Sequence, residues 1–329
     1  MPILKRIAVV TTGGTIAARA ETQTTLGDYE VGQSAQELID ALPELADIAT
    51  VSVHEVCNID SRNMSFAVQH QLIYQVQQLL ARVDIDGVVI THGTDTLEET
   101  ALLLQWCLKS NKPVVLTGAM RPASALSADG ALNLYNAVLV ASHADAHDVG
   151  VMVLLNDVIH SARFVQKMHT SVPEAFASPM QGALGLVSQG VVYINAVPRR
   201  PFGLSSTLNL PSKAELPQVD IIFDHVSAQS NHYKASVLTG SKAVIIAAVG
   251  NGSLSPAARE GALYCYEKGV LCVRASRIPN GAVSPSVQDD EFHTIPAHQF
   301  HAIAARTLVA LALAQGASRE QIAYYLRHY

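Results

Sequence analysis

The sequence predicts an α/β protein, with a large N-terminal domain built on a mostly parallel sheet and a smaller C-terminal α/β domain. Short runs rich in Val and Ile alternate with helical patterns, and this order is typical of a parallel sheet. A Pro-rich stretch interrupts the alternation, which then restarts. The 329 residues also exceed what one core usually supports. We therefore expect domains at 1–197 and 218–329, joined by a linker at 198–217.

The N-terminal domain is expected to contain five strands and four helices. Each strand is brief and bounded by Gly, Pro or Asn, at 6–11, 48–56, 86–91, 113–117 and 150–155. The helices are expected at 34–42, 66–83, 96–108 and 129–142. Ser34 with Glu37 forms the capping-box pattern, and Asp129 is expected to cap the last of these helices. This order of elements predicts a sheet that helices cover on both faces.

The C-terminal domain repeats the alternation on a smaller scale. We expect strands at 219–223, 243–248 and 270–274. Helices are expected near 231–238 and at 255–268, 298–314 and 318–327.

Composition restricts the partners and the compartment. Hydrophobic residues make up 49% of the chain and charged residues 15%, and the net charge of −6 argues against nucleic acid as a partner. No apolar run reaches the ~18 residues that a membrane span needs. The opening residues lack the pattern of a signal peptide, so we expect a cytoplasmic protein, or a periplasmic one if a leader was removed. The cysteines show no zinc-binding spacing and are expected to be buried thiols: Cys57, Cys107, Cys265 and Cys272.

Two similar motifs end predicted strands: "AVVTTGGTIAARA" at 8–20 and "GVVITHGTDTLEETALLL" at 87–104. In the first, two glycines permit a tight turn that presents Thr15, and in the second Gly93 does the same for Thr94 and Asp95. The carboxyl ends of parallel strands line one cleft. We therefore expect these three side chains to share a site.

Taken singly, each motif also fits a strand-to-helix turn with a capping threonine. A phosphate-binding loop is another interpretation, although "TGGTIA" matches neither GxGxxG nor the P-loop pattern. The histidine pairs His143/His147 and His298/His301 have helical spacing but no third ligand at metal spacing, so no metal is expected.

Taken together, the motifs resemble those of the bacterial L-asparaginase family, whose nucleophile is a threonine. The similarity covers the chain from end to end. It rests on "TTGGTIA", "THGTDTLEETA", "GAMRP" at 118–122, "SADGALNLYNAV" at 127–138, "LLNDVI" at 154–159, "VGNGS" at 249–253, "SRIPNGAV" at 276–283 and "QIAYYLRHY".

The resemblance implies a catalytic set. Thr15 would attack the side-chain amide of asparagine, with Tyr29 as the neighbour that activates it. Thr94, Lys167 and Asp95 would form a second set, a hydroxyl beside an ammonium that is shared with a carboxylate. Lys167 lies in "SARFVQKMHTS", which we expect to form a hairpin outside the sheet. Without the resemblance, it would be interpreted as a solvated lysine.

The resemblance also implies how substrate is held. Ser61 would bind the α-carboxylate and Asp95 the α-ammonium. The main-chain N–H of Thr94 would stabilise the oxyanion, and the carbonyl of Ala119 would hold the leaving nitrogen. The family implies a homotetramer, a dimer of dimers, in which Asn251 and Gln288 complete the neighbouring site, and it needs no cofactor.

Two positions depart from the family pattern. Arg62 stands where relatives usually carry Gln, Glu or Ser, and Gln288 stands where the periplasmic branch presents a glutamate. An inward guanidinium ~4 Å from an ammonium would cost about 4 kcal/mol. We expect Arg62 to lie at the cavity rim or pair with a carboxylate, with a solvated arginine as the alternative, and we expect weaker binding of the ammonium. The "DSRNM" at 60–64 and Ser110 favour the cytoplasmic branch.

Three rivals to an L-asparaginase stay open. A glutaminase-asparaginase differs by one methylene of substrate, worth only ~1–3 kcal/mol of discrimination. An archaeal-type amidotransferase subunit carries an extra N-terminal domain, which the position of Thr15 near the first residue disfavours. A nucleotide-binding module is disfavoured because Thr15, Thr94, Asp95 and Lys167 are all present.

Overall fold

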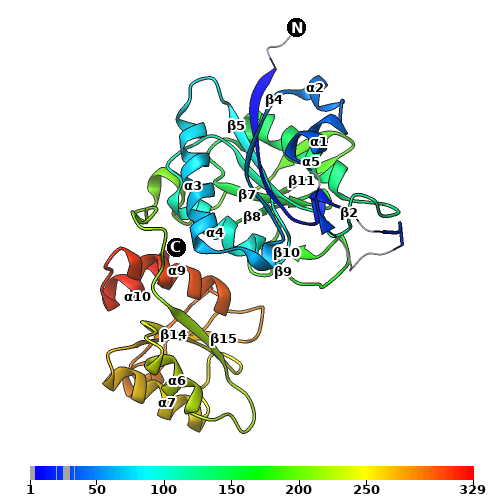
Figure 1. The fold of residues 1–329 in the computed structure, drawn as a ribbon. Coiled ribbons are helices and arrows are strands. Elements are labelled where there is room, and N and C mark those ends of the chain that lie inside the picture. Colours follow the sequence, from blue (N-terminus) through cyan, green and yellow to red (C-terminus); the bar gives the residue numbers. More distant parts are fainter. Residues whose placement is uncertain (1–3, 20, 25–29, 33) are drawn as a thin grey trace. The chain divides into compact units, whose positions relative to one another are not determined.

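A computed structural model describes residues 4–19, 21–24, 30–32 and 34–329. The chain divides into two compact units, Met1–Leu210 and Pro211–Tyr329 (Figure 1). The border falls inside the Pro-rich stretch 198–217. The residues before the border are held to unit 1, because the Lys109 ammonium donates to the carbonyls of Ser206 and Leu208, both at 2.7 Å.

Unit 1 is built on an eight-stranded sheet in the described part of the chain. Its order is β12-β11-β8-β7-β6-β5-β1-β4. The strands are β1 (Lys5–Gly13), β4 (Ala49–Ile59), β5 (Gly87–Thr91), β6 (Val114–Thr117), β7 (Val151–Leu155), β8 (Val158–Ser161), β11 (Gly185–Ser188) and β12 (Val191–Ile194). From β4 to β7 the neighbours pair in parallel, and from β7 to β12 they pair antiparallel. The prediction of a mostly parallel sheet is confirmed.

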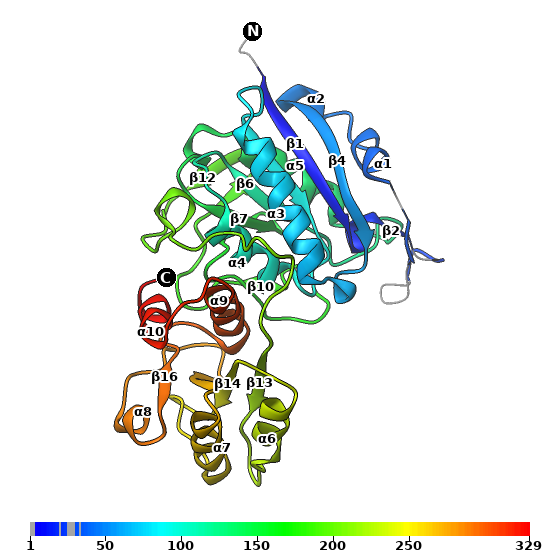
Figure 2. The same ribbon diagram turned by 60° about the vertical axis from the view of Figure 1, so that its left-hand side comes forward.

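Helices cover both faces of this sheet (Figures 1 and 2). The helices α3 (Phe66–Ala81) and α4 (Leu97–Cys107) pack on one face, and α1 (Ala35–Asp40), α2 (Leu45–Ile48) and α5 (Gly130–Ser142) lie on the other. Residues of β1, β5, β6 and α5 form one buried apolar cluster, including Val9, Val89 and Val115. Burying this surface is the main stabilising contribution to the unit.

The ends of the helices follow the predicted capping. Ser34 Oγ accepts from the N–H of Glu37, and the Glu37 carboxylate accepts from the N–H of Ser34, so the capping box at α1 is confirmed. Ser65 caps α3 in the same way, through the N–H of Val68. Asp129 stands at the N-cap position of α5, but its side chain does not cap that helix.

Short elements complete unit 1. Two pairs of two-residue strands lie outside the main sheet: β2 (Ala18–Arg19) with β3 (Glu30–Val31), and β9 (Gln166–Lys167) with β10 (Phe176–Ala177). The described 3-10 turns are Thr15–Ala17, Ser61–Asn63, Ala144–Ala146 and Gly203–Ser205.

Unit 2 is a smaller α/β domain, as predicted. Its parallel sheet has the order β13-β14-β15-β16, formed by Val219–Phe223, Ala243–Ala248, Leu271–Ser276 and Thr294–Pro296. The helices α6 (Asn231–Leu238) and α7 (Pro256–Glu267) pack with the sheet in one buried cluster, while α9 (Ala302–Ala314) contacts β13, β14 and β15. The short α8 (Val287–Glu291) precedes β16, and α10 (Arg319–His328) packs on α9.

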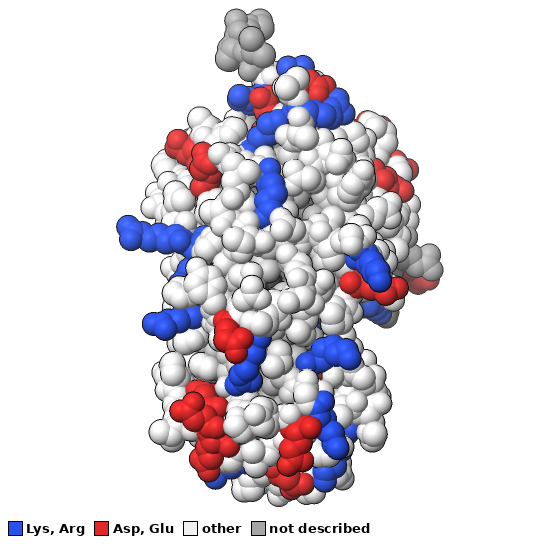
Figure 3. Space-filling model, turned by 90° about the vertical axis from the view of Figure 1, so that its left-hand side faces the viewer, with Lys and Arg blue, Asp and Glu red and all other residues white. Residues whose placement is uncertain are grey.

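The charged side chains are sparse on the face drawn in Figure 3. Blue and red residues stand among uncharged ones, and no continuous basic patch is seen on that face. Within the described residues, no helix is both long and apolar enough to cross a membrane.

Candidate active site

The candidate site lies at the carboxyl ends of β1 and β5. Strand β1 lies between β4 and β5, and the chain runs from β1 to β4 and then crosses β1 to reach β5. The order of the strands therefore reverses at β1, and ligands bind at such a switch point in open α/β sheets. Both glycine motifs follow these two strands.

The two glycine loops touch each other through their backbones. Gly14 has φ 86°, and a Cβ built on it would lie 2.4 Å from the Cα of Gly93. This approach is closer than any side chain permits, so glycine is required at the contact. Thr15 and Thr94 each follow one of these glycines and are 6% and 5% exposed. The contact between Gly14 and Gly93 therefore places the loops that carry the two threonines side by side.

Ser61 belongs to a third segment that joins this contact. A Cβ on Gly93 would lie 2.6 Å from Ser61 Oγ. The same oxygen accepts from the N–H of Asp95 at 3.2 Å, and the hydroxyl of Thr96 donates to the Ser61 carbonyl at 3.0 Å. Ser61 is therefore fixed against the loop that carries Thr94 and Asp95.

Lys167 reaches this loop from the two-stranded pair β9–β10, which confirms the predicted hairpin outside the sheet. Its ammonium donates to Thr94 Oγ1 at 2.9 Å and to Asp95 Oδ1 at 2.5 Å. The Lys167 side chain is 18% exposed, whereas that of Asp95 is 58% exposed. A partly desolvated ion pair that also contacts a hydroxyl is a typical arrangement for proton transfer. Lys167 is not the solvated lysine that its local sequence suggests.

Ala119 lies in the segment that follows β6 and is 1% exposed. The preceding Gly118 packs beside Thr94, because a Cβ on Gly118 would lie 3.2 Å from Thr94 Cγ2. The carboxylate of Asp129 accepts from the N–H groups of Met120 and Arg121, both at 2.9 Å. The prediction that Asp129 caps its own helix is thus wrong, because its carboxylate holds the "GAMRP" segment instead.

Arg62 pairs with Asp60, which is one of the two placements expected. Its guanidinium lies 2.9 Å from Asp60 Oδ2, and its side chain is 72% exposed. Asp60 also accepts from the N–H of Arg62 at 3.0 Å. Tyr29, the other residue predicted near Thr15, lies outside the described residues.

His92 supports the Thr94 loop from inside the core, a role that sequence reasoning missed. The fully buried ring places Nδ1 2.7 Å from the carbonyl of Gly93 and Nε2 3.0 Å from the hydroxyl of Thr100. A carbonyl only accepts, so Nδ1 carries the proton, and Nε2 accepts from Thr100. Burial lowers the pKa of His92 to about 4. The ring is neutral at pH 7 and holds the loop without adding charge.

Glu98 is a second residue that sequence reasoning missed. It lies on the first turn of α4, is 7% exposed, and accepts from the main-chain N–H of Lys167 at 2.7 Å. Burial raises the pKa of Glu98 to about 7. Glu98 is part of the "THGTDTLEETA" motif, but acidic residues are common in the first turn of a helix, so its sequence position alone does not indicate a role in the site.

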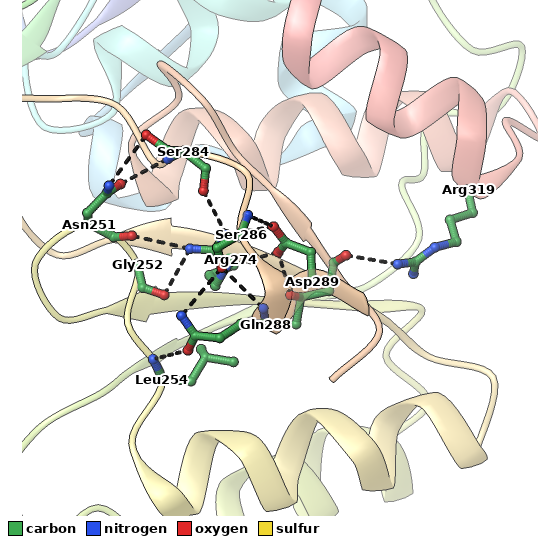
Figure 4. Close-up of polar contacts among 10 residues, drawn as sticks. Asn251, Gly252, Leu254, Arg274, Ser284, Ser286, Gln288, Asp289 and Arg319 are labelled. Atoms are coloured by element: carbon green, nitrogen blue, oxygen red, sulfur yellow. Dashed lines mark hydrogen bonds and ion pairs between the residues drawn. The ribbon is translucent and has the colours of Figure 1, made fainter. Parts of the chain in front are cut away.

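Asn251 and Gln288 lie in unit 2, where they flank one buried arginine (Figure 4). The Arg274 guanidinium donates to the carbonyls of Asn251 and Ser284 and forms a two-pronged ion pair with Asp289 at 3.0 and 2.7 Å. The Asn251 side chain accepts from the N–H of Ser284 at 2.9 Å. The Gln288 side chain accepts from the N–H of Leu254 at 3.2 Å. Arg274 therefore links the segments that carry both residues.

The unit 1 site brings a hydroxyl, an ammonium and a carboxylate together. The Thr94 hydroxyl and the Lys167–Asp95 ion pair lie beside the two glycine loops that follow β1 and β5. In the described part of the chain, no group of three or more His, Cys, Asp and Glu side chains could hold a metal ion.

Comparison with known proteins assigns the family. The family described as "Asparaginase, N-terminal" matches residues 6–200, and "Glutaminase/Asparaginase C-terminal domain" matches residues 218–326. The chain belongs to the asparaginase family.

Individual relatives agree with this assignment. L-asparaginase 2 of Bacillus subtilis is 40% identical over 327 residues, 99% of this chain and 87% of the relative. Glutaminase-asparaginase of Pseudomonas fluorescens is 37% identical over 314 residues, 94% of this chain and 86% of the relative. Among solved structures, a probable cytoplasmic L-asparaginase from Campylobacter jejuni matches with a TM-score of 0.95 and 37% identity. That match covers 99% of this chain and all of the other.

Proposed function

We propose that this protein is an L-asparaginase, an amidohydrolase that converts L-asparagine to L-aspartate and ammonia. The observation that carries the proposal is the Lys167 ammonium, which joins the Thr94 hydroxyl to the Asp95 carboxylate on the loop whose Gly93 touches Gly14, the residue before Thr15. Membership of the asparaginase family and the names of the relatives support the choice of substrate.

In this proposal, Thr15 is the nucleophile. Its hydroxyl oxygen attacks the side-chain carbonyl carbon of asparagine, and Tyr29 activates it. The tetrahedral intermediate places its oxyanion at the main-chain N–H of Thr94, an interaction worth about 3–4 kcal/mol in comparable sites. The C–N bond then breaks, and the nitrogen, held at the carbonyl of Ala119, takes up the proton that Thr15 gave up and leaves as ammonia. Water then attacks the ester carbon on Thr15, which releases L-aspartate and restores the Thr15 hydroxyl. Lys167 exchanges a proton through the Thr94 hydroxyl, to which it is hydrogen-bonded.

The substrate's other groups are held by the neighbouring loops. Ser61 binds the α-carboxylate and Asp95 the α-ammonium. Asn251 and Gln288 of a neighbouring copy complete the site in a homotetramer, a dimer of dimers. A single species of four chains in light scattering is the expected result, and a monomer with full activity would contradict this arrangement.

The activity is tested by ammonia release from L-asparagine and L-glutamine in parallel. We expect asparagine turnover that falls by at least ~10³-fold in Thr15→Ala, because the remaining groups cannot form the bond to carbon. An equal rate with glutamine would instead assign a glutaminase-asparaginase, the second candidate, which a glutaminase-asparaginase relative supports. Turnover of neither amide would contradict the proposed function.

The pairing of Arg62 with Asp60 argues against the weaker ammonium binding expected from the sequence at this position, so Arg62→Gln is expected to change the KM for asparagine by less than ~3-fold. The guanidinium is paired with Asp60 and mostly exposed, so its charge is screened from the ammonium subsite. KM measured for the wild type and the variant at two salt concentrations checks this. A KM that falls tenfold in Arg62→Gln would show that Arg62 faces the substrate and weakens binding of the ammonium.

We further propose that the protein works in the cytoplasm. The Campylobacter jejuni relative is described as cytoplasmic, and Ser110 and the "DSRNM" segment favour the same branch. Fractionation of the native host tests this, and recovery in the periplasm would overturn it.

A further inference from the structure

A buried carboxyl group lies directly behind the Lys167 ion pair. Glu98 is 7% exposed, and its Oε2 accepts from the main-chain N–H of Lys167 at 2.7 Å. The side chain of the same lysine donates to Thr94 and Asp95. Residues 94–98 therefore hold Lys167 both at its main-chain N–H and at its ammonium group.

The hairpin that carries Lys167 packs through its buried residues Gln166, Ala175 and Phe176, but it is not part of the main sheet. The strands β9 and β10 are two residues long and pair only with each other in the described sheets. An isolated two-stranded pair is marginally stable in water. Its position therefore depends on packing and on contacts with other segments, such as the hydrogen bond to Glu98 on the buried helix α4.

We propose that Glu98 is a positioning residue that fixes the Lys167 backbone, and through it holds the Lys167 ammonium between Thr94 and Asp95. This inference rests on the proposed function, because it assigns Lys167 a part in the reaction. Glu98 acts through Lys167 and takes no proton from the substrate. Glu98 is thus a part of the site that takes no part in the bond-making and bond-breaking steps.

The charge on Glu98 adds a pH dependence to this role. Burial and the charge of the neighbouring Glu99 raise the pKa of Glu98 to about 7. The hydrogen bond from the Lys167 N–H and the charge of the Lys167 ammonium lower it, and that ammonium is paired with Asp95. Above pH 7 the group is a carboxylate, which accepts hydrogen bonds about twice as strongly as a neutral group. Below pH 7 it is a neutral carboxyl and holds Lys167 more weakly. The kcat should therefore fall as the pH drops through about 7.

The experiment measures kcat and KM for L-asparagine from pH 5 to 9 in wild type, Glu98→Ala, Glu98→Gln and the control Glu99→Gln. Glu98→Ala removes the acceptor, so kcat is expected to fall ~10–100-fold with KM within ~3-fold, the cost of a small displacement of a catalytic group. Glu98→Gln keeps a neutral acceptor, so its kcat should stay at the lower level that the wild type shows below pH 7, well above that of Glu98→Ala, and should show no step near pH 7. Glu99→Gln also removes one carboxylate, one residue further along α4, and its kcat should still fall as the pH drops through the pKa of Glu98.

A second measurement separates positioning from activity. Hydrogen exchange at the Lys167 amide should be faster in Glu98→Ala than in Glu99→Gln. Wild-type kcat in Glu98→Ala, or an unchanged step near pH 7 in Glu98→Gln, would overturn the inference. If the wild type hydrolyses no amide, the proposed function fails, and the exchange measurement then still reports whether Glu98 fixes the hairpin.

Discussion

Gly14→Ala is expected to destabilise unit 1 by about 3 kcal/mol or more and to remove the activity. The new Cβ would lie 2.4 Å from Gly93 Cα and 2.5 Å from Gly93 N. These contacts are with backbone, which cannot rotate away as a flexible side chain can, so β1 and β5 must separate at their carboxyl ends. The φ of 86° adds a strain of ~1–2 kcal/mol for a residue with a side chain.

Chemical denaturation, with ammonia release measured on the folded fraction, checks this result. Gly190→Ala is the matched control, because Gly190 has φ 76° and a Cβ there would meet no described atom within 4 Å. It isolates the backbone strain from the clash. Equal losses of stability in the two variants would show that the contact between the glycine loops has no special role.

Arg274→Met is expected to destabilise unit 2 by ~3–5 kcal/mol. Arg274 is 1% exposed, and its loss leaves the Asp289 carboxylate, 14% exposed, without its cation. The carbonyls of Asn251, Gly252 and Ser284 lose a donor in the same step. An unpaired buried charge costs more than the pair contributes, so the double variant with Asp289→Leu should recover part of the loss.

Thermal unfolding, with hydrogen exchange of β14 and β15 as the reporter for unit 2, measures this effect. Arg82→Met provides the control, since Arg82 pairs with Asp84 at the surface, where the side chains are 49% and 44% exposed. Its midpoint should not change. An Arg274→Met protein as stable as Arg82→Met would contradict the assignment of Arg274 as the buried link.

Local patterns were sufficient to predict much of the fold. The apolar run 243–248 matches β14 residue for residue, and the Ser34–Glu37 signal gave the correct capping box. Shorter elements such as β8 and β16 were missed, because three or four residues carry too little periodicity. The antiparallel side of the main sheet was missed for the same reason.

The candidate site divides in a similar way. The glycine turns that present Thr15 and Thr94 could be predicted, because a turn is encoded within a few residues. The burial of Lys167 could not, since it depends on β9 meeting a loop some 70 residues earlier in the chain. Asp129 shows the reverse error. Its local sequence is typical of a helix cap, but the backbone of Met120 and Arg121 uses its carboxylate.

The neutral ring of His92 has a consequence for acid tolerance. The pKa of His92 in the folded chain is about 4, against 6.5 for an ordinary histidine. Between these two pH values the ring is protonated in the unfolded chain and neutral in the folded chain. The stability that this burial provides is complete above pH 6.5 and declines as the pH falls toward 4. The added proton must enter at Nε2, where the Thr100 hydroxyl now donates, so acidification breaks the hydrogen bond that joins the ring behind the Thr94 loop to helix α4.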